Sequence, residues 1–222
     1  MKRLEIDSVT KSFGSTRILR DIFLQVEAGE IVGLMGRNGS GKSTLLKIVF
    51  GSLQASNAFI RADSRHMFSQ ADRYRWLTYL PQETFLPRHM TIREVLTLFC
   101  SREAVRYLAQ SELIAPHISF KARQLSLGTL RTIEVLLLIY SQAQYTLLDE
   151  PFHSLAPLVK EEVRFHISRQ TQHKGFLLTD HDYRNLLEVS DRIILLDQGK
   201  TFPIQGKQEL VDRGYLSAQS LS

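Results

Sequence analysis

The chain has 222 residues, of which 43% are hydrophobic, enough for a folded core and too many for a disordered chain. Its net charge of +5 permits an anionic ligand but does not demand a nucleic acid. The single cysteine, Cys100, excludes an internal disulfide, and the longest uncharged stretch, residues 135–148, is shorter than the roughly 20 residues of a membrane-spanning helix. We therefore expect a soluble protein of one domain, or of one domain with an insertion.

The first elements predicted along the chain are strands. Apolar and polar residues alternate in residues 4–6 and 22–26, which is typical of strands with one buried face. Residues 31–36, IVGLMG, form a continuous apolar run that suits a strand buried on both faces. Residues 52–78 contain strand-like pieces without a strong period.

Residues 36–43, GRNGSGKS, fit the phosphate-loop pattern G-x-x-x-x-G-K-[ST] between the predicted strand and the helix-like STLLKIVFG. The glycines allow a tight turn that brings backbone N–H groups against phosphate oxygens. Lys42 would meet the β- and γ-phosphates, and the Ser43 hydroxyl would bind Mg²⁺. The predicted nucleotide-binding residues here are Gly36, Arg37, Asn38, Gly39, Ser40, Gly41, Lys42, Ser43 and Thr44. The loop predicts a phosphate-loop nucleotide-binding protein.

The remainder of the chain predicts alternating helices and strands. Thr91 and Glu94 match a capping box, so we expect a helix to begin there. YTLLD, GFLLTD and RIILLD are short apolar runs that each end near an aspartate. Strands separated by helical stretches indicate an α/β fold with a largely parallel sheet, and residues 197–200 predict a turn in a small hairpin.

Two acidic residues follow the predicted strand YTLLD. The strand would carry Asp149 to the sheet edge beside the phosphate loop, where it can hold Mg²⁺ directly or through water. Glu150 is one residue further on, so its side chain points elsewhere and can reach an attacking water as a general base. The alternative is a pair of surface acids at a strand end, which the nearby phosphate loop disfavours.

With these motifs in order, the chain resembles the nucleotide-binding subunit of an ABC transporter over nearly its whole length. Phe13, in KSFGSTRIL, resembles the aromatic residue that stacks on adenine, although a place in the core explains it equally well. Gln82, in YLPQ, resembles the Q-loop glutamine that contacts Mg²⁺ or water. His181, in LLTDHD, resembles the switch histidine that contacts the γ-phosphate.

This resemblance implies a P-loop NTPase (RecA-like) core with a mostly parallel sheet, an antiparallel β subdomain and a short helical subdomain. The whole of residues 1–222 would form a single ABC-type nucleotide-binding domain, with the helical insert at about residues 83–130. Within the insert, MTIREVLTLF resembles the helix lining the groove that receives the transporter's coupling helix. Phe85, Leu86 and Phe99 are candidate groove residues, with ordinary core packing as an equally good interpretation.

The stretch LSLGTLR, residues 125–131, falls where the family has its signature LSGGQ. In the family, the signature of one subunit closes over the γ-phosphate held by the other, through a serine hydroxyl, a glycine backbone and a helix N-terminus. Ser126 and Gly128 match that pattern, whereas Leu127 and Thr129 replace a glycine and a glutamine. We interpret the stretch as a variant signature rather than a plain helix start.

The resemblance implies a subunit that binds and hydrolyses ATP with Mg²⁺ and powers an ABC transporter. The expected partners are a separate transmembrane permease subunit and a second nucleotide-binding subunit, identical or different, on the cytoplasmic face of the membrane. The implied catalytic residues are Glu150, His181 and Gln82, and the implied metal ligands are Ser43, Gln82 and Asp149. No nucleic-acid partner is expected, because acidic residues dilute the arginines and aromatics of residues 59–76.

Two alternatives remain at this point. The first is an ABC-type ATPase that does not take part in transport. The second is a subunit that binds ATP but hydrolyses it weakly. It is favoured by the variant signature and by Ala156 in PFHSLAP, where the family usually has an aspartate that couples the two sites of the dimer.

Overall fold

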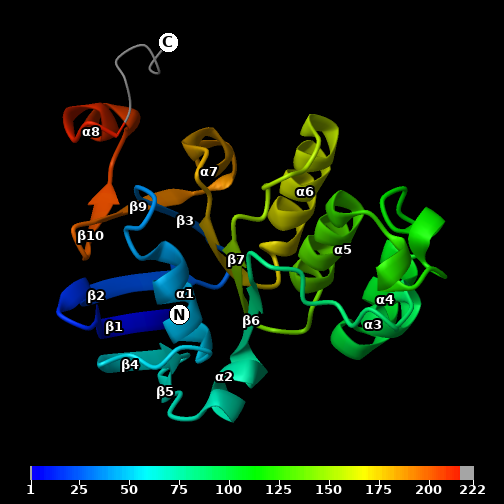
Figure 1. Ribbon diagram of the computed structural model, residues 1–222, viewed down its shortest axis with the longest axis horizontal. Helices are drawn as coiled ribbons and strands as arrows, with labels where there is room; N and C mark the ends of the chain where they lie inside the picture. Colours follow the sequence, from blue (N-terminus) through cyan, green and yellow to red (C-terminus); the bar gives the residue numbers. More distant parts are fainter. Residues whose placement is uncertain (1, 216–222) are drawn as a thin grey trace.

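The computed structural model describes residues 2–215, and the strands of this range form two sheets (Figure 1). The antiparallel sheet has the order β2-β1-β4-β5 and the larger sheet the order β10-β9-β3-β8-β7-β6. The strands are β1 (Arg3–Phe13), β2 (Thr16–Glu27), β3 (Ile31–Met35), β4 (Asn57–Ala62), β5 (Arg65–His66), β6 (Leu77–Leu80), β7 (Tyr145–Asp149), β8 (Gly175–Thr179), β9 (Arg192–Asp197) and β10 (Lys200–Ile204). In the larger sheet only β10 pairs antiparallel, with β9. This arrangement confirms the predicted α/β fold class.

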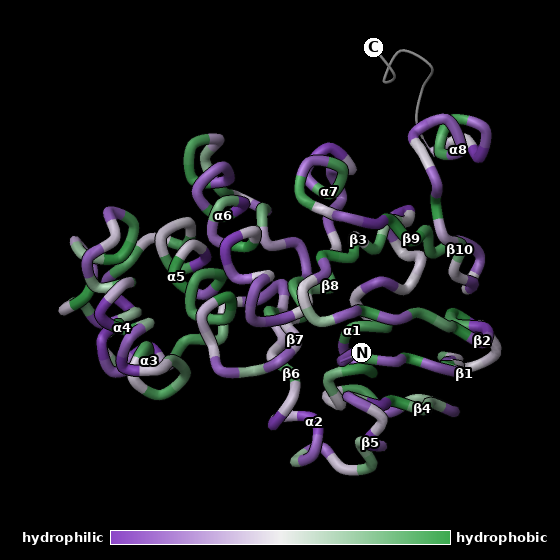
Figure 2. Tube along the Cα trace, turned by 180° about the vertical axis from the view of Figure 1, so that it is seen from behind, coloured by the Kyte–Doolittle hydropathy of each residue, from purple (hydrophilic) through white to green (hydrophobic). Residues whose placement is uncertain are grey.

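The central parallel strands are buried on both faces, which explains their continuous apolar sequences. Along β9, Ile193 and Leu195 belong to one hydrophobic core, and Ile194 and Leu196 belong to the other. One core includes residues of α5 (Leu127–Ile139), α6 (Pro157–Gln170) and α7 (Tyr183–Val189), and the other includes α1 (Lys42–Phe50) and the antiparallel sheet. The hydrophobic colour accordingly follows β3 and β9 through the middle of the molecule (Figure 2).

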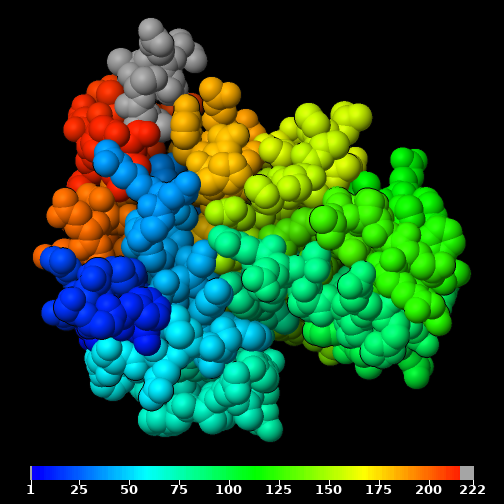
Figure 3. All heavy atoms as spheres, viewed as in Figure 1, coloured from blue at the N-terminus to red at the C-terminus, as the bar shows by residue number. Residues whose placement is uncertain are grey.

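A helical region lies between β6 and α5 in the sequence and forms one end of the molecule, drawn in green at the right of Figure 3. It contains α3 (Ile92–Phe99), α4 (Arg102–Leu108) and the short 3₁₀ helices Ala115–His117 and Ala122–Gln124. The side chain of Thr91 accepts a hydrogen bond from the backbone N–H of Glu94, and the Glu94 carboxylate accepts one from that of Thr91. The predicted capping box is therefore confirmed, while the predicted limits of the insert, about 83–130, remain a prediction.

The structure also defines residues 52–78, for which the sequence pattern gave no clear prediction, and the predicted turn near the end of the chain. Residues 52–78 hold β4 and β5 and also the short helix α2 (Gln70–Trp76), which begins with a capping box at Ser69. The predicted turn joins β9 to β10 with Lys200 opposite Asp197, and both Gln198 and Gly199 have positive φ, as a tight hairpin turn requires. A last helix, α8 (Lys207–Asp212), follows β10. Among residues 2–215, no helix combines the length and the apolar character needed to cross a bilayer.

Lys174 fastens the end of α5 to the sheet. Its side chain is buried just ahead of β8, and its Nζ donates a hydrogen bond of 2.5 Å to the backbone carbonyl of Ser141, which follows α5. Burial lowers the pKa of Lys174 to about 8, an effect partly opposed by the neighbouring Cys100 thiol.

The buried Lys174 predicts a stability that rises with pH. Its folded pKa of about 8 lies below the ordinary value of 10.5, so between these values the unfolded chain binds a proton that the folded chain has released. The cost of burying the charge is present below pH 8 and fades as the pH rises toward 10.5. We expect the urea-unfolding free energy of the wild type, minus that of Lys174→Met, to rise by about 2 kcal/mol from pH 7 to pH 10. A difference independent of pH would contradict this account.

Candidate nucleotide-binding site

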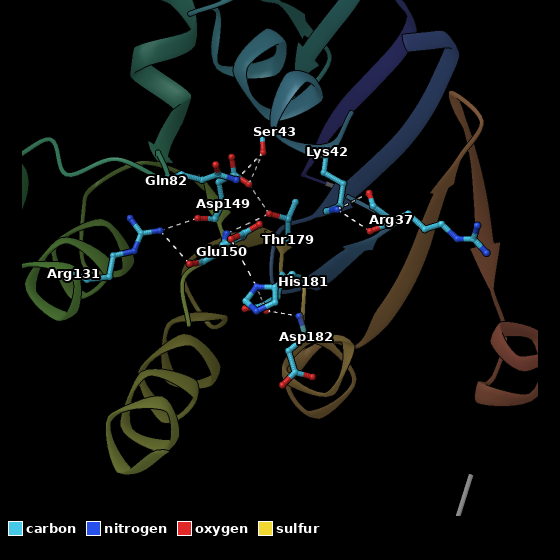
Figure 4. A network of polar contacts seen from close by, with 12 residues as sticks. Arg37, Lys42, Ser43, Gln82, Arg131, Asp149, Glu150, Thr179, His181 and Asp182 are labelled. Atoms are coloured by element: carbon cyan, nitrogen blue, oxygen red, sulfur yellow. Dashed lines mark hydrogen bonds and ion pairs between the residues drawn. The ribbon is translucent and has the colours of Figure 1, made fainter. Parts of the chain in front are cut away.

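The candidate functional residues meet at the carboxyl ends of β3, β7 and β8, the edge at which open α/β sheets bind ligands (Figure 4). A hollow of about 530 Å³ opens there, in front of the loop that connects β3 to α1. Its lining consists of Phe13, Ile18, Asn38, Gly39, Ser40, Gly41, Lys42, Ser43, Thr44, Gln82, Glu150, His153 and His181. Residues from five separate parts of the chain therefore surround one cavity.

The lysine of the phosphate loop is bonded to the backbone of the loop itself. Lys42 Nζ donates to the backbone carbonyls of Gly36 (2.7 Å) and Arg37 (3.2 Å), so its ammonium group lies inside the curve of the loop. Burial lowers the pKa of Lys42, and the nearby carboxylates, Glu150 first, act in the opposite direction. Gly41 has a φ of 104°, and a Cβ there would lie 2.8 Å from Ile18 Cγ2, so a side chain at this position would both strain the backbone and collide.

Ser43, Gln82 and Asp149 form a connected set of oxygen-bearing side chains on the floor of the site. Ser43 Oγ donates to Asp149 Oδ1 (3.1 Å), and Gln82 Nε2 donates to Ser43 Oγ (3.1 Å). Hydroxyl, carboxylate and amide oxygens are the donors that Mg²⁺ prefers in proteins. These three residues, which come from the start of α1, the loop after β6 and the end of β7, therefore fit a Mg²⁺ ion.

Two further side chains hold the Asp149 carboxylate, and the sequence analysis missed both. Thr179 Oγ1 donates to Asp149 Oδ1 (2.7 Å), and the Tyr79 hydroxyl donates to Oδ2 (3.1 Å). Burial and the adjacent carboxylate raise the pKa of Tyr79, so its hydroxyl keeps its proton and remains a donor. Because Asp149 is paired with Thr179 and flanked by β6, its orientation is set by the parallel sheet itself.

Glu150 leaves the sheet in a different direction from Asp149. Its φ is 52°, in the left-handed region, and its backbone N–H donates to the carbonyl of Thr179 (3.0 Å). This turn directs the Glu150 side chain into the hollow, where Oε2 lies 3.7 Å from Nδ1 of His181. The His181 ring is half exposed and also lies 3.5 Å from the buried Asp180 carboxylate. The predicted general base and the predicted switch histidine are thus neighbours.

Arg131, another residue that the sequence analysis did not single out, fixes the backbone behind these acids. From α5 its guanidinium donates to the carbonyls of Pro81 (2.6 Å), Asp149 (2.8 Å) and Glu150 (3.0 Å). The guanidinium is buried and lies 3.8 Å from the buried carboxylate of Glu134. The available signal was a charged pair, Arg131 and Glu134, spaced by three residues in an otherwise apolar helix.

Some predicted residues point away from the hollow or lie outside it. The carbonyl of Arg37 accepts from Lys42, but its side chain extends away from the Lys42 ammonium group (Figure 4). The Arg37 guanidinium lies 5.3 Å from the centre of the Tyr215 ring. Ser126 and Gly128 are absent from the lining and lie at the start of α5, where Ser126 caps the helix by accepting from the N–H of Thr129 (3.2 Å). The variant residue Leu127 is 74% exposed.

The structure separates alternatives that the sequence left open for three aromatic or aliphatic residues. Phe13 is 51% exposed and lines the hollow, so its interpretation as a core residue is wrong. Leu86 is buried in the hydrophobic core and does not line the apolar hollow beside it, so it is not a groove residue. Phe85 and Phe99 instead lie beside each other along a second, apolar hollow between β6 and α3.

Comparison with known proteins agrees with this geometry. The sequence profile of the family described as ABC transporter matches residues 19–153, which include the phosphate loop and both acids. The lipopolysaccharide export system ATP-binding protein LptB of Acidithiobacillus ferridurans is 31% identical, over 94% of this chain and 92% of that protein. The chain belongs to the ABC transporter family. Its P-loop fold is accordingly that of the ABC ATPase domains.

Another relative of this ABC protein is longer than the chain. The sulfate/thiosulfate import ATP-binding protein CysA of Synechococcus elongatus is 29% identical over 94% of this chain, which spans only 64% of the CysA length. A solved structure described as an ATP-binding subunit of an ABC transporter superimposes with a TM-score of 0.83, at 22% identity, over 97% of this chain and 95% of its own. That likeness shows the fold of the ABC ATPase domain.

Proposed function

We propose that the chain binds and hydrolyses ATP and powers an ABC transporter whose membrane-spanning part is a separate chain. The observation that carries the proposal is a hollow lined by Lys42, Ser43, Gln82, Glu150 and His181. The buried Asp149 carboxylate accepts from the Ser43 hydroxyl at its wall. The similarity to LptB, described as an export-system ATP-binding protein, supports the transport role.

Each of these groups has a defined task in phosphoryl transfer. Lys42 neutralises charge on the β- and γ-phosphates, and the exposed ring of Phe13 offers a face to the adenine. Ser43, Asp149 and Gln82 would hold Mg²⁺, which would supply positive charge to neutralise the phosphates. Glu150 accepts the proton of the attacking water, and His181 contacts the γ-phosphate.

The position of the variant signature supports a site completed by a second subunit. Ser126 and Gly128 lie outside the hollow of their own chain, on a helix start whose free N–H groups can bind an anion. In a dimer they would close over the γ-phosphate of the partner, identical or different. The exposed Leu127 side chain would then lie against the partner subunit.

A subunit that binds ATP but hydrolyses it weakly is a second candidate function, and Ala156 is the observation that favours it. Ala156 is the N-cap residue of α6, and no side chain caps this helix. An aspartate there would cap the helix and offer a charged group to the partner, whereas alanine does neither. Coupling between the two sites would be weaker as a result.

The apolar hollow between β6 and α3 is the proposed contact with the permease. It has a volume of about 570 Å³, and Leu98 at its edge is 68% exposed. Phe85 and Phe99 line the same hollow and face each other at 6.4 Å between ring centroids. A short apolar helix face from a membrane chain would cover these side chains.

Changing Leu98 tests this contact. We expect Leu98→Asp to lose co-purification with the cognate permease in detergent, because it places a charge in an apolar interface. ATP hydrolysis by the isolated chain should stay at the wild-type rate, since Leu98 is exposed and does not line the nucleotide hollow. Leu158→Asp is the matched control, because Leu158 on α6 is also an exposed leucine and does not line the apolar hollow. Undiminished co-purification of Leu98→Asp would refute the contact.

Removal of magnesium tests the hydrolytic function itself. The purified chain should release phosphate from ATP in the presence of Mg²⁺ and lose this activity when EDTA is added. The reason is that hydrolysis requires the Mg²⁺ ion that Ser43, Gln82 and Asp149 would hold. Restoring excess Mg²⁺ should restore the rate. An ATPase rate that is insensitive to EDTA, or no phosphate release at all, would argue against the proposed chemistry.

A further inference from the structure

Three side chains that line the nucleotide hollow gather in a way that hydrolysis alone does not require. Glu150, His153 and His181 each offer one donor atom, and these atoms all lie within 4.8 Å of one another. The rings of His153 and His181 meet edge to face, with centroids 5.6 Å apart. Both histidines are exposed, so an ion can reach them from solvent. We infer that this cluster is a binding site for a transition-metal dication of the Zn²⁺ type.

The donor set selects the class of metal. Two imidazoles and one carboxylate are a ligand set that Zn²⁺ uses in catalytic sites, where a fourth position stays open. Mg²⁺ prefers oxygen ligands, so it favours the neighbouring set around Asp149. Tetrahedral Zn²⁺ with bonds of about 2.1 Å places its ligand atoms about 3.4 Å apart. To reach this value from the observed spread of up to 4.8 Å, the two exposed histidine side chains would rotate toward the Glu150 carboxylate.

The backbone already holds two of the ligands together. Glu150 and His153 are the ends of one tight turn, in which the N–H of His153 donates to the carbonyl of Glu150 (3.2 Å). The Glu150 carbonyl also accepts from Arg131, which anchors this turn to α5. His181 comes from the loop after β8, and the buried Asp180 carboxylate lies 3.5 Å from its Nδ1. A carboxylate next to a histidine ring is the partner that commonly orients a metal-binding histidine.

His153 is the member of the cluster that has no part in the proposed hydrolysis. It lines the hollow, yet Mg²⁺ coordination and water activation are assigned to other residues. A metal bound here would occupy the carboxylate of Glu150 and the ring of His181 together. Zn²⁺ would therefore inhibit ATP hydrolysis, a consequence that rests on the proposed function, whereas the metal site itself does not.

Direct binding to the ATP-free full-length chain tests the site. Zn²⁺ is titrated in competition with a chromogenic chelator, and Co²⁺ is used as a spectroscopic probe of tetrahedral coordination. We expect one Zn²⁺ per chain, an affinity at least about tenfold weaker in His153→Ser, and loss of the tetrahedral Co²⁺ spectrum in that variant. His89→Ser, an exposed histidine in the loop before α3, should bind as the wild type does. Equal Zn²⁺ affinity of His153→Ser and the wild type would overturn the inference.

A second measurement separates this inference from the proposed function. Phosphate release is measured in excess Mg²⁺ with and without added Zn²⁺, and the fold-inhibition is compared between the wild type and His153→Ser. Greater inhibition of the wild type supports a metal bound at the cluster. Equal inhibition of both proteins would show that Zn²⁺ acts elsewhere, and would count against the inference. A wild type that binds Zn²⁺ through His153 but never hydrolyses ATP would overturn the proposed function and leave the metal site standing.

Discussion

Glu150→Gln will lower ATP hydrolysis by at least about 100-fold while leaving ATP binding close to that of the wild type, because a general base contributes roughly 10² to 10⁴ to a rate. The turn at Glu150 directs its carboxylate into the hollow, 3.7 Å from His181, and away from the Asp149 metal set. Glutamine keeps the size and a hydrogen-bonding amide but cannot accept a proton from water. Lys42, Ser43 and Asp149 remain in place to bind the nucleotide.

The measurement is steady-state phosphate release in Mg²⁺ beside equilibrium binding of a fluorescent ATP analogue. Glu83→Gln is the matched control, since Glu83 is an exposed glutamate next to Gln82 that does not line the hollow. We expect this control to hydrolyse ATP at the wild-type rate. If Glu150→Gln kept a substantial fraction of the activity, the assignment of the general base would be wrong.

Arg131→Ala will lower the free energy of unfolding by about 3–5 kcal/mol, the typical result of removing one partner of a buried ion pair. The substitution leaves the carbonyls of Pro81, Asp149 and Glu150 without the guanidinium that now donates to them. It also leaves the fully buried Glu134 carboxylate without its countercharge, although the N–H of Phe85 still donates to it (2.7 Å). The loss should appear as a lower urea midpoint.

Two variants show whether geometry or charge accounts for this loss. Arg131→Lys keeps the charge but lacks the planar fork that serves three carbonyls, so its stability should fall between those of the wild type and Arg131→Ala. Arg123→Ala removes an exposed arginine nearby and should change the unfolding free energy by no more than about 0.5 kcal/mol. A change in unfolding free energy for Arg131→Ala as small as that for Arg123→Ala would contradict the role of Arg131 in holding the three carbonyls.

The features predicted from sequence are those encoded by neighbouring residues. The phosphate loop, the acidic strand end and the capping box at Thr91 depend on spacings of a few residues, and the structure contains the corresponding loop, strand and cap. The α/β class followed from alternating apolar runs and helical stretches, which are local patterns too. The roles assigned to the site residues remain predictions.

The features that sequence reasoning missed depend on contacts between distant residues. Arg131 reaches Pro81 across 50 positions, and Tyr79 reaches Asp149 across 70. No periodicity links such pairs, because the fold alone brings them together. The same limit applied to Leu86, whose burial depends on the helices packed over it, and to His153, whose neighbour His181 comes from a different strand end.

The central claim is that two chains share each hydrolytic site, and specific ATPase activity as a function of protein concentration tests it most directly. For two identical chains, the account predicts that activity per chain rises with concentration to a plateau. It also predicts that the variant Ser126→Arg binds ATP normally, because Ser126 does not line the nucleotide hollow of its own chain. The same variant should remain inactive at every protein concentration. Activity per chain that is independent of concentration, with Ser126→Arg as active as the wild type, would contradict a shared site.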